Sequence, residues 1–203
     1  FKEGVSFATF TPDNKLVYAI TNLGRDKSAL VLMDPATCEE LEQLYTNDKY
    51  DLGGLWYSDA QKKLLGVSYE GHKGKTRYFF DKATEEMLGR MERHLRGYEI
   101  GIGGSNKAED KYIVYAGGDR TMGAYYFYDV KSDTMTKLAD LAPWIDEKQM
   151  AEMTPVTYTS RDGLEIEGYL TLPVGKTLHN AKNLPVVVNP HGGPWARDSW
   201  GFN

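Results

Sequence analysis

A glycine-containing turn near the end of the 203-residue sequence carries the residue types best suited to chemistry. It reads Asn189-Pro190-His191-Gly192-Gly193-Pro194-Trp195. Consecutive glycines let the backbone adopt conformations closed to other residues and let a ligand approach closely. Backbone amides in such a turn can stabilise the negative charge that develops on a carbonyl oxygen under attack. The turn therefore predicts an oxyanion loop at His191, Gly192 and Gly193, with Pro194 and Trp195 as candidate lining of a substrate cleft.

The segment before the turn must position it. Val186 to Val188 form a short β-branched run, which is typical of a strand buried on both faces of a parallel sheet. We expect a strand here, ending in the glycine turn. For His191 a role in the oxyanion loop competes with a purely structural hydrogen bond.

Further upstream the sequence repeats itself at a long period. Asp34, Asp81 and Asp129 each end an apolar run, recur at intervals of 47 and 48 residues, and are followed three residues later by Thr or Ser. That pairing predicts a side-chain-capped turn between antiparallel strands. Four short strands fit each repeat, which is the pattern of β-propeller blades.

The expected strands fall in three groups of four. The first group is 6–10, 16–20, 29–33 and 40–45; the second is 52–57, 64–69, 77–80 and 87–90; the third is 100–104, 112–116, 125–128 and 135–139. Three blades do not close a ring, since propellers use about four to eight. We therefore expect a fragment of a longer propeller, or blades supplied by another chain.

The pattern changes after the third group. Asp146, with Gln149 three residues later, predicts a short helix, and 156–160 with 164–172 predict a hairpin around the Asp162-Gly163 turn. We expect propeller blades over 1–141, a linker over 142–155 and a second domain over 156–203. The fold class is therefore mainly β, with about three four-stranded antiparallel blades followed by the first strands of a second domain.

Composition narrows the classes of function. A net charge of -5 without basic clusters argues against nucleic acid as a partner. No apolar run approaches the roughly 18 residues that cross a membrane. Cys38 is the only cysteine, so an internal disulfide or a multi-cysteine metal site is excluded. Neither His72 nor His94 has metal-ligand spacing, so we expect both at the solvated surface. We expect no metal and no cofactor.

The motifs from Ser160 to Pro194 resemble the prolyl oligopeptidase family of serine peptidases. The matching segments are Ser160-Arg161-Asp162-Gly163-Leu164-Glu165-Ile166-Glu167-Gly168-Tyr169-Leu170, then Leu184-Pro185-Val186-Val187-Val188, then His191-Gly192-Gly193-Pro194. The acylaminoacyl-peptidase and dipeptidyl-aminopeptidase-like branch is the nearest. The resemblance implies an N-terminal propeller joined to a C-terminal α/β-hydrolase domain, which would begin within 156–203.

The resemblance also implies catalytic residues that this chain lacks. The family's nucleophile sits in Gly-x-Ser-x-Gly, followed by Asp and then His. No serine here has glycine on both sides at that spacing: Ser68 and Ser105 each fail at the last position. The triad is expected beyond Asn203, and the chain itself is expected to be inactive. In some members of the family a tyrosine side chain at the position of His191 hydrogen-bonds the oxyanion. In this chain either the His191 imidazole donates that hydrogen bond or only the backbone amides of the loop do.

The sequence therefore predicts part of a peptidase acting on short peptides. An esterase of the same hydrolase class and a non-catalytic propeller that binds a partner protein remain as alternatives. The expected partners are a peptide substrate and the rest of the catalytic domain, with no nucleic acid and no membrane span. A homo-oligomer stays open, as does the choice between cytoplasm and periplasm.

Overall fold

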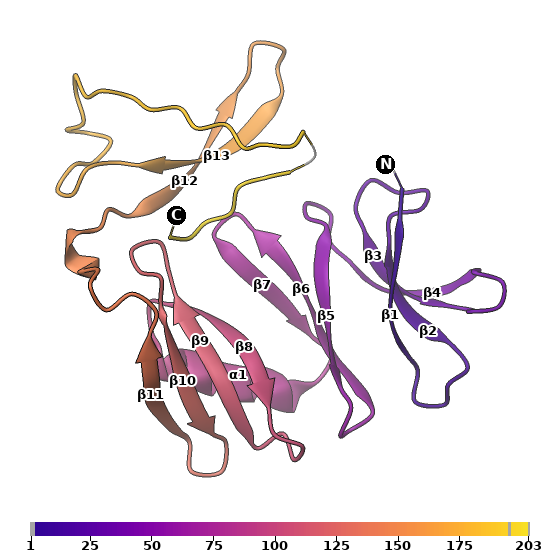
Figure 1. The fold of residues 1–203 in the computed structure, drawn as a ribbon. Coiled ribbons are helices and arrows are strands. Elements are labelled where there is room, and N and C mark those ends of the chain that lie inside the picture. Colours follow the sequence, from indigo (N-terminus) through magenta and orange to yellow (C-terminus); the bar gives the residue numbers. More distant parts are fainter. Residues whose placement is uncertain (1–2, 195, 203) are drawn as a thin grey trace. The chain divides into compact units, whose positions relative to one another are not determined.

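The computed structural model describes residues 3–194 and 196–202. The chain divides into two compact units, which are described separately. The first comprises Phe1–Gly71 with Lys75–Gly89, and the second comprises His72–Gly74 with Arg90–Asn203. Most of the regular structure is antiparallel sheet (Figure 1).

The first unit opens with a four-stranded meander. Its strands, in spatial order, are β1 (Val5–Phe10), β2 (Val17–Thr21), β3 (Ala29–Met33) and β4 (Glu40–Thr46). All four coincide with predicted strands to within about two residues, which is the usual disagreement at strand ends. The inner strand β3 carries the core of this sheet, because Ala29, Leu30 and Val31 are completely buried.

The second sheet has three strands rather than the expected four. They are β5 (Leu52–Ser58), β6 (Lys63–Gly71) and β7 (Gly74–Phe79), and helix α1 (Lys82–His94) follows them. The prediction of a strand over 87–90 was wrong. Four apolar side chains of this region are buried at helical rather than alternating spacing: Met87, Leu88, Met91 and Leu95.

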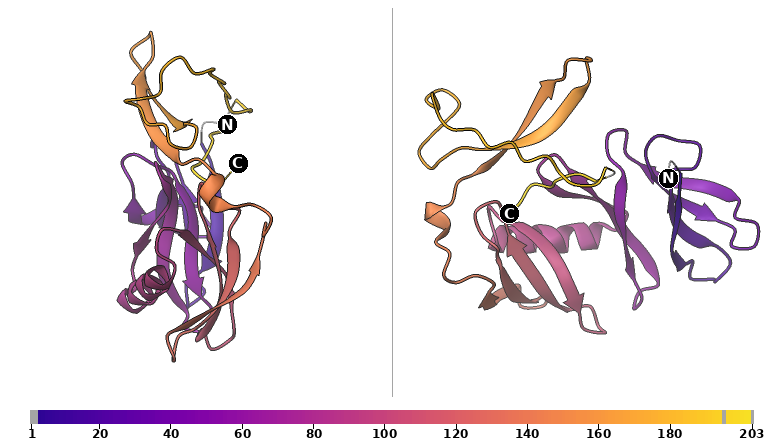
Figure 2. Two further views of the ribbon diagram at one scale, coloured as in Figure 1. Left: turned by 90° about the vertical axis from the view of Figure 1, so that its left-hand side faces the viewer. Right: turned by 45° about the horizontal axis from the view of Figure 1, so that its top comes forward.

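The second unit holds another four-stranded meander and a hairpin. The meander consists of β8 (Glu99–Ser105), β9 (Lys111–Gly117), β10 (Ala124–Asp129) and β11 (Thr134–Asp140), and Figure 2 shows it from two further sides. The hairpin consists of β12 (Met153–Thr159) and β13 (Glu165–Thr171). These strands confirm the expected third group and the hairpin around Asp162-Gly163.

The segment between meander and hairpin contains the predicted short helix as a single 3-10 turn, η1 (Glu147–Gln149). The Asp146 carboxylate caps it by accepting the Lys148 amide. Two contacts fix η1 to neighbouring elements: the Tyr98 hydroxyl donates to Glu147 Oε2 at 2.8 Å, and Arg120 lies 3.4 Å from Glu147 Oε1.

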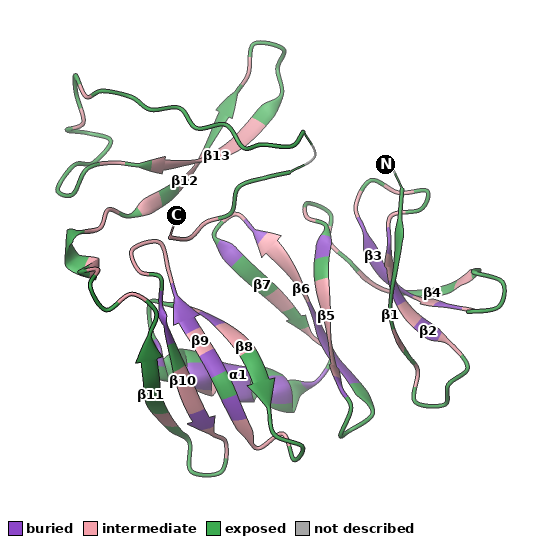
Figure 3. Cartoon of the chain, viewed as in Figure 1, coloured by how far each residue is buried: buried purple, intermediate pink, exposed green. Residues whose placement is uncertain are grey.

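The strand expected at Val186 to Val188 does not form. These three valines are 82%, 91% and 81% exposed, and Figure 3 shows the segment as exposed coil. A strand of a parallel sheet needs a neighbour that takes up its backbone hydrogen bonds. No strand of the described residues pairs with this segment, so the valines do not form the strand that their β-branched side chains favour.

The repeated aspartates act as predicted, by capping backbone amides. Asp34 accepts from Ala36 and Thr37, and Asp129 accepts from Lys131 and Ser132. Asp81 accepts from both the amide and the hydroxyl of Thr84, but there the capped turn starts helix α1.

The second and third aspartates share a further contact. Asp81 pairs with Lys63 and Asp129 with Lys111, and in both cases the lysine lies 18 residues earlier, at the start of the preceding strand. Hydrogen bonds from these lysines lower the pKa of each carboxyl from 3.8 to about 2. Leu16 occupies the equivalent place in the first copy, so this ion pair distinguishes the two later repeats.

Removing the Asp81 side chain is expected to weaken the start of helix α1 in a pH-dependent way. Loss of an N-cap costs about 1 kcal/mol. Because the folded-state pKa of Asp81 is lowered to about 2, its contribution is present above pH 4 and is lost as pH falls through 2. Urea unfolding of wild type and Asp81→Ala should differ most at neutral pH and converge near pH 2. Asp59→Ala, which removes an exposed carboxylate, serves as the control; a pH-independent difference for Asp81→Ala would contradict the linkage.

Candidate functional site

The predicted oxyanion loop lies in exposed coil of the second unit. His191 Nδ1 lies 2.8 Å from the carbonyl oxygen of Gly192. A carbonyl oxygen only accepts, so Nδ1 must carry the hydrogen of this bond. Nδ1 is therefore engaged within the loop and does not face an incoming carbonyl group.

The two glycines provide such amides. Gly193 has φ of 142°, inside the region that favours glycine, and nothing lies within 4 Å of the position that a Cβ on Gly192 would occupy. Among the described residues, neither amide has a hydrogen-bond acceptor. Because both residues lack a side chain and neither amide has an acceptor in the part of the chain that the structure describes, a carbonyl group could approach these two amides closely.

Pro194 and Trp195 were the residues predicted to line a substrate cleft. Pro194 is exposed, and its carbonyl accepts the Ala196 amide at 3.0 Å. Trp195 lies outside the described residues. No serine of the described residues stands in a Gly-x-Ser-x-Gly motif.

Trp200 is a packing residue in this structure. Its indole Nε1 donates to the Met153 carbonyl at 2.8 Å, and Lys73 Nζ lies 5.3 Å from the ring centroid. A Cβ on Gly118 would lie 3.7 Å from the indole, at ordinary van der Waals distance. Trp200 thereby fastens the end of the chain to β12.

The two histidines expected at the solvated surface differ. His94 is exposed, and its Nε2 lies 3.2 Å from Asp133 Oδ1, which also accepts the Tyr128 hydroxyl. His72 is half-buried, with its ring 6.4 Å from that of Tyr169. Its Nε2 and the Tyr169 hydroxyl are buried without a hydrogen-bond partner among the described residues, so the surface interpretation of His72 was wrong.

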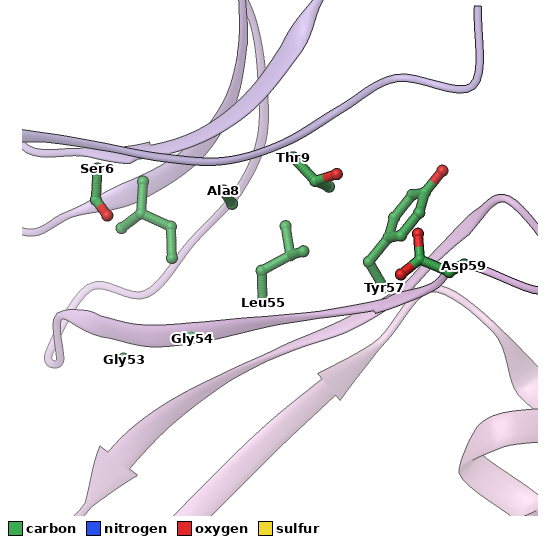
Figure 4. A pocket seen from close by; sticks show the side chains of 9 residues that line it. Ser6, Ala8, Thr9, Gly53, Gly54, Leu55, Tyr57 and Asp59 are labelled. Atoms are coloured by element: carbon green, nitrogen blue, oxygen red, sulfur yellow. The ribbon is translucent and has the colours of Figure 1, made fainter. Parts of the chain in front are cut away.

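The first unit contains an open cavity of about 450 Å³ between β1 and β5. Figure 4 shows Ser6, Ala8 and Thr9 facing Leu55 and Tyr57 across it. Gly53, Gly54 and Asp59 also line the cavity. Hydroxyl groups and one carboxylate give this cavity a polar surface suited to hydrogen bonding.

In the part of the chain that the structure describes, no three His, Cys, Asp or Glu side chains gather closely enough to hold a metal ion. Among the same residues, no helix has the length and apolar character needed to cross a membrane.

Comparison with known proteins gives sequence relatives and structural neighbours. The chain is 30% identical over 196 residues to dipeptidyl aminopeptidase BIII of Pseudoxanthomonas mexicana, covering 95% of this chain and 28% of that protein. Dipeptidyl peptidase family member 6 of Caenorhabditis elegans is 23% identical, over 96% of this chain and 29% of its own length. The chain thus spans less than a third of the relatives it matches. No protein-family model matches it.

The fold is shared with a solved prolyl endopeptidase. The TM-score is 0.55 at 14% identity, and the match covers 86% of this chain and 25% of that structure. The three- and four-stranded antiparallel sheets β1–β4, β5–β7 and β8–β11 therefore match propeller blades of the kind found in such enzymes.

Proposed function

We propose, from the premise that this chain is a relative of the prolyl oligopeptidase family of peptidases, that it is part of a serine peptidase acting on short peptides. The expected type is an acylaminoacyl- or dipeptidyl-peptidase. The observation that carries the proposal is the 30% identity with a dipeptidyl aminopeptidase over nearly the whole chain. That similarity extends over both the blades and the segment that contains the loop at His191.

The loop amides supply one part of the proposed chemistry. A serine hydroxyl from the rest of the catalytic domain adds to the peptide carbonyl carbon while a histidine base takes its proton, and the carbonyl π electrons move to oxygen. The amides of Gly192 and Gly193 are proposed to stabilise this oxyanion. When the intermediate collapses, the C–N bond breaks and the leaving amine takes the proton from the histidine. Loss of one such donor typically lowers kcat by about 10²–10³-fold.

A fluorophosphonate probe tests the proposal, since it labels activated serines. Intact masses are compared for this chain and for the longer protein proposed to contain it. We expect a single adduct on the longer protein and none on this chain. An adduct on this chain would contradict the proposed location of the nucleophile. A folded longer protein without an adduct would favour a binding propeller, whereas labelling with hydrolysis of esters only would favour the esterase.

A further inference from the structure

A second cavity, of about 490 Å³, lies within the second unit. It is enclosed on one side by residues 148–154, which run from η1 into β12. On the other side lies the stretch from the end of β13 through residue 179. We call this cavity the linker groove. Its volume is within the range of about 300–1,000 Å³ that small-molecule sites occupy.

Aliphatic side chains make up part of the lining of the linker groove, and we call this part its floor. Thr154 and Leu170 are direct cross-strand partners and line it together, so one face of the β12–β13 hairpin forms the base. Leu172, Val174 and Leu178 also line the groove. Val174 and Leu178 are 61% and 69% exposed, which leaves aliphatic surface available to a ligand.

The charged side chains that line the groove are mainly cationic, in a chain whose net charge is -5. The lining includes three Arg or Lys side chains but only one carboxylate, that of Glu152. The three cations are Arg120, Lys148 and Lys176. Arg120 makes one 3.4 Å contact to Glu147, while Lys148 and Lys176 have no carboxylate partner among the described residues. Excess positive charge on a partly enclosed surface raises the local concentration of anions.

Charge and apolar surface together select the ligand. An inorganic anion would leave the aliphatic floor in water, and a neutral apolar molecule would leave the cations without a counter-charge. We propose that the linker groove binds the C-terminal carboxylate of a short peptide whose last side chain is aliphatic. Lys148, Lys176 and the available edge of Arg120 receive the carboxylate, and Leu170, Leu172 and Val174 contact the side chain. The proposal is argued from residues of this chain and does not depend on the peptidase assignment.

Calorimetric titration of the chain with acetyl-Ala-Leu tests the site, and acetyl-Ala-Leu amide serves as the uncharged comparison. We expect the amide to bind about tenfold more weakly, because charge-assisted hydrogen bonds are lost. Lys176→Gln should weaken the free acid several-fold without affecting the amide. Leu178→Ser should weaken both. Arg120 is left intact because its contact with Glu147 fixes η1.

Lys107→Gln provides the matched control, since Lys107 is an exposed lysine between β8 and β9, away from the groove lining. Its affinity for acetyl-Ala-Leu should equal that of wild type. Equal binding of acid and amide would overturn the proposal, as would a Lys176→Gln variant that binds like wild type. Binding of acetate as tight as that of acetyl-Ala-Leu would also overturn it, because the floor would then contribute nothing.

Discussion

Gly123→Ala is expected to destabilise the second unit by about 3 kcal/mol, from a strained backbone and a direct steric clash. Gly123 is buried, has φ of +90° and directly precedes β10. An added Cβ would lie 2.3 Å from the Ala116 carbonyl oxygen and 3.0 Å from Gly117 Cα. Both are backbone atoms of the paired strand β9, so they cannot move aside without disturbing the β9–β10 ladder.

Gly97→Ala separates the two causes. Gly97 has a similar φ of +88°, but no atom lies within 4 Å of the position that its added Cβ would occupy. Only the conformational cost remains, about 1–2 kcal/mol. Urea unfolding followed by circular dichroism should rank wild type, Gly97→Ala and Gly123→Ala in that order of stability. Equal losses for the two variants would mean that the contact with Ala116 is relieved at no cost.

Leu30→Ala is expected to cost about 2–5 kcal/mol, the range for a buried leucine that leaves a cavity. Leu30 is completely buried on β3, where it packs with Leu52, Leu64 and Val67 of the neighbouring sheet. These residues belong to β5 and β6, so one cluster joins two blades within the first unit. The truncation should therefore weaken the contact between blades as well as the first sheet.

Leu41→Ala is the matched control, because Leu41 lies on the adjacent strand β4 and is 52% exposed. Its change in unfolding free energy should stay within about 0.5 kcal/mol. Thermal unfolding of both variants gives the comparison. If the two leucines lowered the melting temperature equally, the Leu30 cluster would not be the core of this unit.

The blade strands could be predicted because polar turns separate short apolar runs of nearly constant period. Helix α1 was missed because Asp81 and Thr84 repeat the spacing that ends in a strand turn elsewhere. The distinguishing signal is the burial of Met87, Met91 and Leu95 at intervals of four residues, which only a helix places on one face. Local capping chemistry is the same in both outcomes, so it could not separate them.

The site was predictable only in part. A glycine turn is a local sequence feature, so His191 to Gly193 could be identified as a loop. The linker groove has no comparable signal, because Arg120, Lys148 and Lys176 are far apart along the chain and only the folded structure brings them to one cavity. The orientation of the His191 ring likewise depends on a contact with a neighbouring carbonyl, which sequence does not specify.

The exposed valines at 186–188 have a consequence for behaviour in concentrated solution. Unpaired β-branched segments offer a template on which a second molecule can add a strand. Pro185 and Pro190 stand at either side of the run and have no amide hydrogen to donate. They confine any intermolecular ladder to the few residues between them. The two prolines are therefore expected to limit fibril growth by this segment. The valines between them remain able to pair with a neighbouring strand.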